Sequence, residues 1–67
     1  MKGINKRIRA FRKLKGLTQQ DLADEIGVSV AVLGSVERGN RDPDLILLEK
    51  ICLALQIDMD ELLKEEV

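Results

Sequence analysis

The side chains that carry most enzyme chemistry are scarce in this chain of 67 residues. It has no His and a single Cys, Cys52, so an ordinary zinc site and an internal disulfide are both excluded. It also lacks a phosphate-binding loop, a setting that would activate the cysteine, and paired carboxylates in a recognisable pocket. We therefore expect no metal, no cofactor and no enzymatic activity. A binding function that relies on hydrogen bonds and charge is expected instead.

The charged residues are divided unevenly along the sequence. Residues 1–41 contain nine Lys and Arg against four Asp and Glu, a formal charge of +5. From Asp42 onward two Lys face eight acidic residues, which gives −6 and leaves a net charge of −1. A polyanion responds to the local patch, because fields are screened beyond about 10 Å at moderate salt. The N-terminal half could therefore meet phosphates, although two solvated faces without a function would have the same pattern.

The segment from Gln19 to Arg38 places apolar residues at helical spacing on both sides of Gly27. These residues are Leu22, Ala23 and Ile26 before the glycine, and Leu33 and Val36 after it. A glycine suits the left-handed conformation with which a chain leaves a helix, and the small Ala23 allows two helices to cross closely. The pattern predicts a helix-turn-helix that presents its second helix to the DNA major groove.

Other helices must hold this motif in place. Ile4, Ile8, Phe11 and Leu14 form a helical stripe that ends before Gly16, which predicts a first helix. Pro43 stops any helix from running through residues 39–43. Further helices are expected at residues 45–55 and 59–64, which makes five short helices around one core, an all-α fold that forms a single domain over residues 1–67.

Residues suited to capping precede four of these helices. They are Thr18, Ser29, Asp44 and Asp58, and each side chain can accept a hydrogen bond from the first helical turn. Asp58 is followed three residues later by Glu61, a pair that resembles a capping box.

The whole chain resembles the Cro/C1-type helix-turn-helix family, also called the Xre family, of phage repressors and bacterial regulators. The matching segments are residues 8–12, 17–23, 26–29, 36–39, Pro43 and 51–63. The resemblance implies a lambda-repressor-like helix-turn-helix domain and double-stranded DNA as its partner.

The resemblance places one set of DNA contacts at the start of the second helix. Gln19 matches a residue that typically touches the DNA backbone and sometimes a base edge, and Thr18 and Gln20 flank it. The alternative for both glutamines is an ordinary polar residue in a first helical turn.

A second set of family positions lies at the end of the third helix. Asn40 and Arg41 match a loop that often contacts phosphate, and Arg38 points the same way, although each could equally be a solvated side chain. Arg12 and Glu37 match a pair that in several relatives forms an ion pair between the first helix and the end of the third. For that pair a structural role is expected rather than direct contact with bases.

The third helix offers few hydrogen-bonding groups to DNA. The residues expected to point toward DNA are Ala31, Gly34, Ser35 and Arg38, with Val30 and Val32 on the flanks and Ser29 at the start of the helix. Val30 and Ala31 could touch thymine methyl groups, and Ser35 could bond to several bases. The missing side chain of Gly34 either allows a close approach to DNA or is simply tolerated, at about 1 kcal/mol relative to Ala. Direct base contacts should be modest, so phosphate contacts and DNA deformability would supply much of the affinity.

The fourth helix carries more apolar residues than one buried face needs. Ile46 and Leu53 lie seven residues apart on a second face, with Lys50 between them, and an exposed apolar patch of this kind indicates a partner surface. We expect a symmetric homodimer through the fourth and fifth helices, with Ile57 and Met59 also at the interface. The alternative is a thicker monomer core.

Together these features predict a sequence-selective, repressor-like DNA-binding transcriptional regulator that occupies an inverted repeat as a dimer, with no evident small-molecule ligand. The alternative is a protein-interaction module of the same fold, such as an antirepressor, antitoxin or regulatory subunit, with weak or no DNA binding. No apolar run approaches the roughly 18 residues that span a bilayer, and the first residues lack the apolar stretch of a signal peptide. A cytoplasmic protein that does not contact membranes is expected.

Overall fold

The computed structural model describes residues 3–64, which form five helices and no strand. The helices are α1 (Ile4–Leu14), α2 (Gln19–Ile26), α3 (Val30–Glu37), α4 (Leu45–Leu55) and α5 (Met59–Leu63). The all-α prediction is confirmed, and only the end of the last helix differs, because Lys64 is already extended. No helix within residues 3–64 is long and apolar enough to cross a bilayer.

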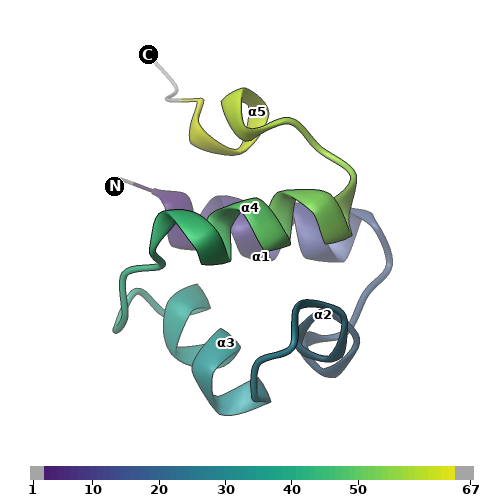
Figure 1. Ribbon diagram of the computed structural model, residues 1–67, viewed down its shortest axis with the longest axis vertical. Helices are drawn as coiled ribbons and strands as arrows, with labels where there is room; N and C mark the ends of the chain where they lie inside the picture. The colour runs from purple at the N-terminus through teal and green to yellow at the C-terminus, as the bar shows by residue number, and fades with distance from the viewer. Residues whose placement is uncertain (1–2, 65–67) are drawn as a thin grey trace.

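The helices lie in three levels (Figure 1). α1 and α4 run side by side through the middle, α2 and α3 lie on one side of them, and α5 lies on the other. One cluster of buried side chains connects all five helices, and it consists of Ile4, Ile8, Leu22, Ala23, Ile26, Leu33, Val36, Leu48, Ile51, Cys52, Leu55 and Leu62. The two groups of apolar residues that flank Gly27 are therefore core residues, as the sequence predicts.

The first helix departs from its expected stripe at its last residue. Leu14 is 76% exposed, whereas Arg12 is buried. At 100° per residue, position 14 lies about 80° to one side of Ile4 and position 12 about 80° to the other. The core covers the side of Arg12, and the half-buried Leu17 packs against the core from beyond the end of the helix.

Three of the four expected caps form. Thr18 Oγ1 accepts a hydrogen bond from the backbone N–H of Asp21 at 3.0 Å, and the Asp21 carboxylate accepts one from the N–H of Thr18 at 2.9 Å. Ser29 and Asp44 cap α3 and α4 in the same way. The expected side-chain cap at Asp58 is absent, because the N–H of Glu61 donates to the backbone carbonyl of Asp58 instead.

Gly27 makes the turn between α2 and α3 with a φ of 73°. The N–H of Val28 then donates to the carbonyl of Ala23 at 3.1 Å, which satisfies a carbonyl in the last turn of α2. The buried Ala23 lets the next helix pack close by, so the expected helix-turn-helix is present.

Arg7 attaches α5 to α1, a contact that the sequence analysis did not foresee. Its guanidinium donates to the carbonyl of Leu62 at 2.9 Å and to that of Glu61, and it lies 5.4 Å from the centre of the Phe11 ring. A cation at a helix C-terminus satisfies carbonyls that have no partner within the helix. Arg7 therefore stabilises the contact between α1 and α5, and its charge is not available to a ligand of the N-terminal half.

Candidate nucleic-acid interface

The outer side of α3 is open. α1, α4 and α5 all lie on its other side (Figure 1), and Ala31 and Arg38 are exposed while Val32 and Ser35 are half-buried. Residues 3–64 place no segment over this side, so a ligand as large as a DNA duplex can reach it.

A buried ion pair holds α3 against α1. Arg12 Nε lies 2.7 Å from Glu37 Oε2, and Arg12 Nη2 donates to Glu37 Oε1 at 3.0 Å. Only 8% of the Arg12 side chain and 2% of the Glu37 side chain are exposed. Two parallel bonds between a guanidinium and a carboxylate fix orientation as well as distance, so the pair sets the angle at which α3 leaves the body of the protein.

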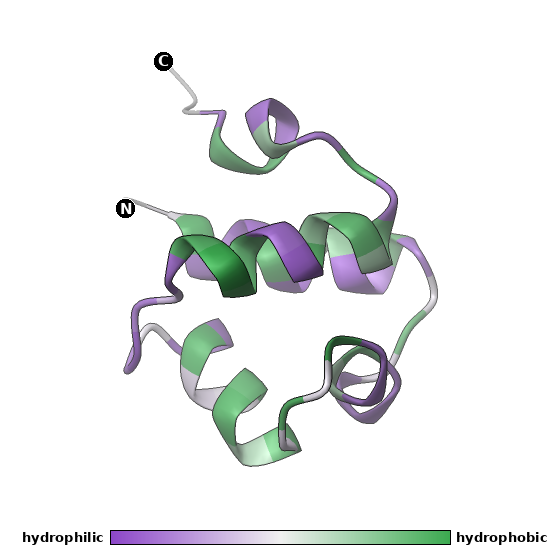
Figure 2. Ribbon diagram, in the orientation of Figure 1, coloured by the Kyte–Doolittle hydropathy of each residue, from purple (hydrophilic) through white to green (hydrophobic). Residues whose placement is uncertain are grey.

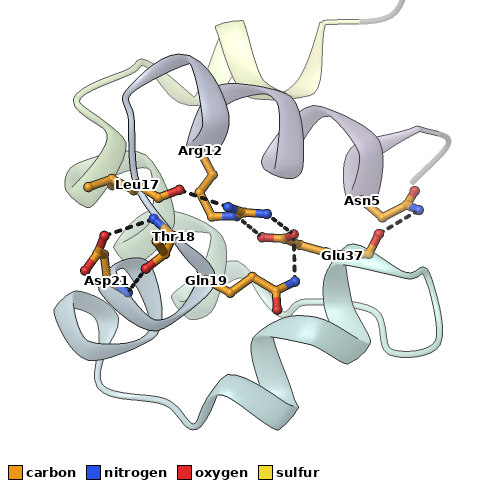
Figure 3. Close-up of polar contacts among 7 residues, drawn as sticks. All are labelled: Asn5, Arg12, Leu17, Thr18, Gln19, Asp21 and Glu37. Carbon is orange, nitrogen blue, oxygen red and sulfur yellow. Dashed lines mark hydrogen bonds and ion pairs between the residues drawn. The ribbon is translucent and has the colours of Figure 1, made fainter.

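Neighbouring groups complete the hydrogen bonding of this pair (Figure 3). Arg12 Nη1 donates to the carbonyl of Leu17 at 2.9 Å, in the segment that leads into α2. Gln19 Nε2 donates to Glu37 Oε1 at 3.1 Å, and Asn5 Nδ2 donates to the backbone carbonyl of Glu37 at 3.3 Å. Both ends of the helix-turn-helix are therefore tied to α1 through one carboxylate.

The pKa of Glu37 reflects this setting. Burial acts to raise the pKa, but the hydrogen bonds from Arg12 and Gln19 and the charges of Arg12 and Arg9 outweigh it. The pKa therefore lies below the ordinary value of 4.5, and the carboxylate is charged at neutral pH.

The residues at the helix starts that are expected to touch DNA already make some of their hydrogen bonds within the fold. Gln19 is half-buried and uses its amide N–H on Glu37, while its Oε1 accepts no hydrogen bond from residues 3–64. Gln20 is exposed, and its amide donates to Asp24 at 2.7 Å. The hydroxyls of Thr18 and Ser29 accept capping bonds, which leaves their hydroxyl protons free to donate outward.

The expected DNA-facing residues of α3 separate into two groups. Ala31 is exposed and Ser35 is half-buried, whereas Val30 packs partly against the core. Gly34, expected to lie open on this face, is buried instead, because the side chains of Arg38 and Gln19 lie over it. Figure 2 shows that α3 is hydrophobic or neutral along nearly its whole length, which agrees with the shortage of polar groups in its sequence.

The loop after α3 lies beside this face. Asn40 and Arg41 are both exposed, and the N–H of Asn40 donates to the carbonyl of Ser35 at 2.9 Å, which folds the loop back against the helix end. The other exposed cations of the N-terminal half include Arg9, Lys13 and Lys15.

Part of the acidic C-terminal half lies far from this face. Asp58, Asp60 and Glu61 are exposed at α5, which lies at the opposite end of the molecule from α3 (Figure 1). The charge division along the sequence is thus only partly a division in space, because Asp42 and Asp44, which follow the loop, and Asp24 and Glu25 of α2 are also exposed near the helix-turn-helix.

Comparison with known proteins agrees with this geometry. The family described as Helix-turn-helix matches residues 8–62. The chain belongs to the Cro/C1-type helix-turn-helix family. It is 49% identical over 61 residues to YazB of Bacillus subtilis, an uncharacterized HTH-type transcriptional regulator, covering 91% of this chain and 88% of that one. YqaE of Bacillus subtilis and the SinR proteins of Bacillus licheniformis and Bacillus subtilis are longer, and this chain covers 54% to 58% of their length.

Solved structures of similar proteins share the whole arrangement. The restriction-modification controller protein C.AhdI from Aeromonas hydrophila is 39% identical with a TM-score of 0.85, over 88% of this chain and 89% of that one. The P22 c2 repressor protein, solved in complex with a synthetic operator, is 35% identical with a TM-score of 0.83, over 94% of this chain and 96% of that one. The lambda-repressor-like fold expected from the sequence is confirmed.

Removal of one partner of the ion pair should destabilise the fold strongly. Arg12→Ala or Glu37→Ala leaves a buried charge without its partner, at a cost of about 3–5 kcal/mol in the free energy of unfolding. Replacement of both, as in Arg12→Met with Glu37→Leu, should cost much less than the sum of the two. Urea unfolding followed by circular dichroism measures each loss. Lys13→Ala, an exposed cation of the same helix, is the matched control, and additive losses at Arg12 and Glu37 would contradict the coupling.

The stability of the fold should also fall in acid. Because the pKa of Glu37 is lower in the folded chain than in the unfolded one, the unfolded state binds more protons in this range. The stabilisation is complete above the ordinary value of 4.5 and is lost as the pH falls through the folded pKa. Urea unfolding at a series of pH values tests this. Arg12→Met with Glu37→Leu should show a flatter profile, retaining only contributions such as that of Asp21, whose pKa is lowered by its hydrogen bonds with Thr18. An unchanged profile would assign the acid sensitivity to other groups.

Proposed function

We propose that this protein is a sequence-selective DNA-binding transcriptional regulator that acts in the manner of a repressor, by occupying an operator. The observation that carries the proposal is the open outer side of α3, held in a fixed orientation by the bonds among Arg12, Glu37 and Gln19. A rigid helix that stands clear of its own fold is what the major groove admits. The similarity to a repressor solved with its operator supports the same conclusion.

In this proposal the contacts divide by type. The start of α2, with Thr18, Gln19 and Gln20, and the loop with Asn40 and Arg41 meet phosphates on either side of the groove. Such contacts fix register and orientation without sequence information. The outer residues of α3 then face base edges, where Ala31 can contact a thymine methyl group and Ser35 can exchange a hydrogen bond.

We further propose that two copies associate through the outer face of α4 and bind an inverted repeat. Ile46 is 66% exposed and Leu53 is 82% exposed on that face, and Leu45 beside them is 63% exposed. Ile57 and Met59, expected at the interface, are half-buried against their own core, so α4 supplies most of the apolar surface. A two-fold axis pairs one patch with its copy and presents two α3 helices to half-sites about 34–36 Å apart.

A groove beside this face offers a place for a partner side chain. It has a volume of about 450 Å³ and runs between the end of α2 and α4, with Leu53 and Ala54 on one side. Asp24, Glu25 and Lys50 also line it, so an apolar side chain of the second copy could enter while Lys50 meets a carboxylate at the rim.

DNA binding should weaken steeply as salt rises. A regulator that neutralises several phosphates releases counterions, so the logarithm of its affinity falls with the logarithm of salt by about 0.9 for each phosphate contacted. Fluorescence anisotropy with a random-sequence duplex measures this slope. Arg41→Glu should weaken binding to all sequences alike, whereas Lys64→Glu, the same charge reversal just beyond α5, should have little effect. Negligible affinity at low salt would refute the regulator and favour an interaction module.

Sedimentation equilibrium should show a dimer at micromolar concentrations. Leu53→Lys should shift the protein to a monomer, because it places a charge in the apolar face. Leu14→Lys is the matched control, since Leu14 is 76% exposed but belongs to α1. A wild-type protein that remains monomeric at tens of micromolar would defeat the dimer proposal.

A further inference from the structure

Arg38 folds back along the outer side of α3 instead of extending into the loop that follows. Arg38 is the C-cap residue that directly follows Glu37, the last residue of α3, yet its Nη2 lies 3.4 Å from the hydroxyl of Ser35, almost a full turn earlier. The guanidinium also lies over the backbone of Gly34 and contributes to the burial of that residue. The guanidinium of Arg38, the only positively charged group on the outer side of α3, therefore lies beside Gly34 and Ser35 within the helix.

The absence of a side chain at position 34 leaves room for this placement. A Cβ atom built on Gly34 would lie 3.0 Å from Arg38 Nη1 and 3.9 Å from Arg38 Cζ. Real Cβ atoms rarely make so close a contact, so an alanine at position 34 would require the guanidinium to shift by a few tenths of an ångström. Because the near atom is the end of a flexible side chain and not backbone, the helix itself can accept the methyl group. Gly34 thus has a positioning role that its sequence context did not reveal.

The guanidinium remains available to a ligand. Arg38 is exposed, and no carboxylate within residues 3–64 forms an ion pair with it, since the pair there is Arg12 with Glu37. Its contact with Ser35 is long, and an arginine carries five N–H donors in a planar fork, so donors are left over. Every other outward residue of α3 lacks such a fork.

We propose that Arg38, positioned by Gly34, contacts the edge of a guanine in the major groove and is the main specificity-determining residue of α3. This inference rests on the proposed DNA-binding function. A fork of two parallel N–H donors matches the O6 and N7 acceptors of guanine, and no other base presents that pair of acceptors in the groove. Held over Gly34, the fork lies on the surface that faces base edges, whereas the loop residues Asn40 and Arg41 remain for the phosphates.

Selection from a pool of random duplexes, followed by competition binding on the selected site, tests the assignment. The wild-type protein should select a site with a guanine at one position of each half. Arg38→Lys keeps the charge but replaces the planar fork with a single ammonium group, so it should reduce the preference for that guanine by up to about 150-fold, the full discrimination of one bidentate contact, and leave affinity for random DNA and its salt dependence nearly unchanged. Arg41→Lys, the same change in the loop, should leave the preference intact.

Gly34→Ala provides an independent test, because it alters the position of Arg38 without changing its chemistry. It should relax the same guanine position, but less than Arg38→Lys does, because the guanidinium shifts by only a few tenths of an ångström, and combination with Arg38→Lys should add little. Since Ala forms helices better than Gly, the melting temperature should not fall, which separates the effect from unfolding.

The outcomes distinguish the two proposals. If the wild-type protein enriches no sequence at all, the regulator function fails and this assignment fails with it. If the wild-type protein selects a site, but Arg38→Lys and Gly34→Ala retain the same base preference, the regulator stands and the assignment of Arg38 is overturned. A uniform loss of affinity for all sequences in Arg38→Lys would make Arg38 a phosphate contact and would also overturn it.

Discussion

The buried pair of Arg12 and Glu37 is the interaction on which the rest of the structure depends. Two charges removed from water destabilise a fold unless every donor and acceptor finds a partner, and here Leu17, Gln19 and the pair itself provide them. No buried side-chain nitrogen or oxygen within residues 3–64 is left without a hydrogen bond. This network explains how eight-residue helices, with so small a core behind them, hold one orientation. A surface that must match a DNA groove needs that rigidity.

The same network limits what the neighbouring residues can offer to a ligand. Gln19 contributes its amide N–H to Glu37, and the hydroxyls of Thr18 and Ser29 accept capping bonds. The polar groups left for DNA are then mainly those of the loop after α3 and the guanidinium of Arg38. In the proposed complex an apolar helix of this kind would concentrate its specificity in very few side chains.

The fold was largely accessible from the sequence, and the site only in part. The helix starts at Thr18, Ser29 and Asp44 and the turn at Gly27 followed from residue types whose effect is local. The failures involve contacts between distant residues. Leu14 fits a helical stripe but lies beyond the core. Arg7 has the sequence context of a surface cation, but its guanidinium binds carbonyl groups at the end of α5. The burial of Gly34 depends on a side chain four residues away that folds back over it.

Residue order alone therefore determined where the helices begin, most of the residues that face inward, and the uneven division of charge. These properties arise from hydrogen bonds and periodicity within a few residues of one another, and they do not require knowledge of the neighbours. Only the tertiary structure decided which polar groups are used up inside the fold and which remain outside it. Which polar groups are bonded inside the fold depends on which helices meet. Burial makes an unpaired donor or charge costly, so each buried polar group bonds to a partner that lies close in space.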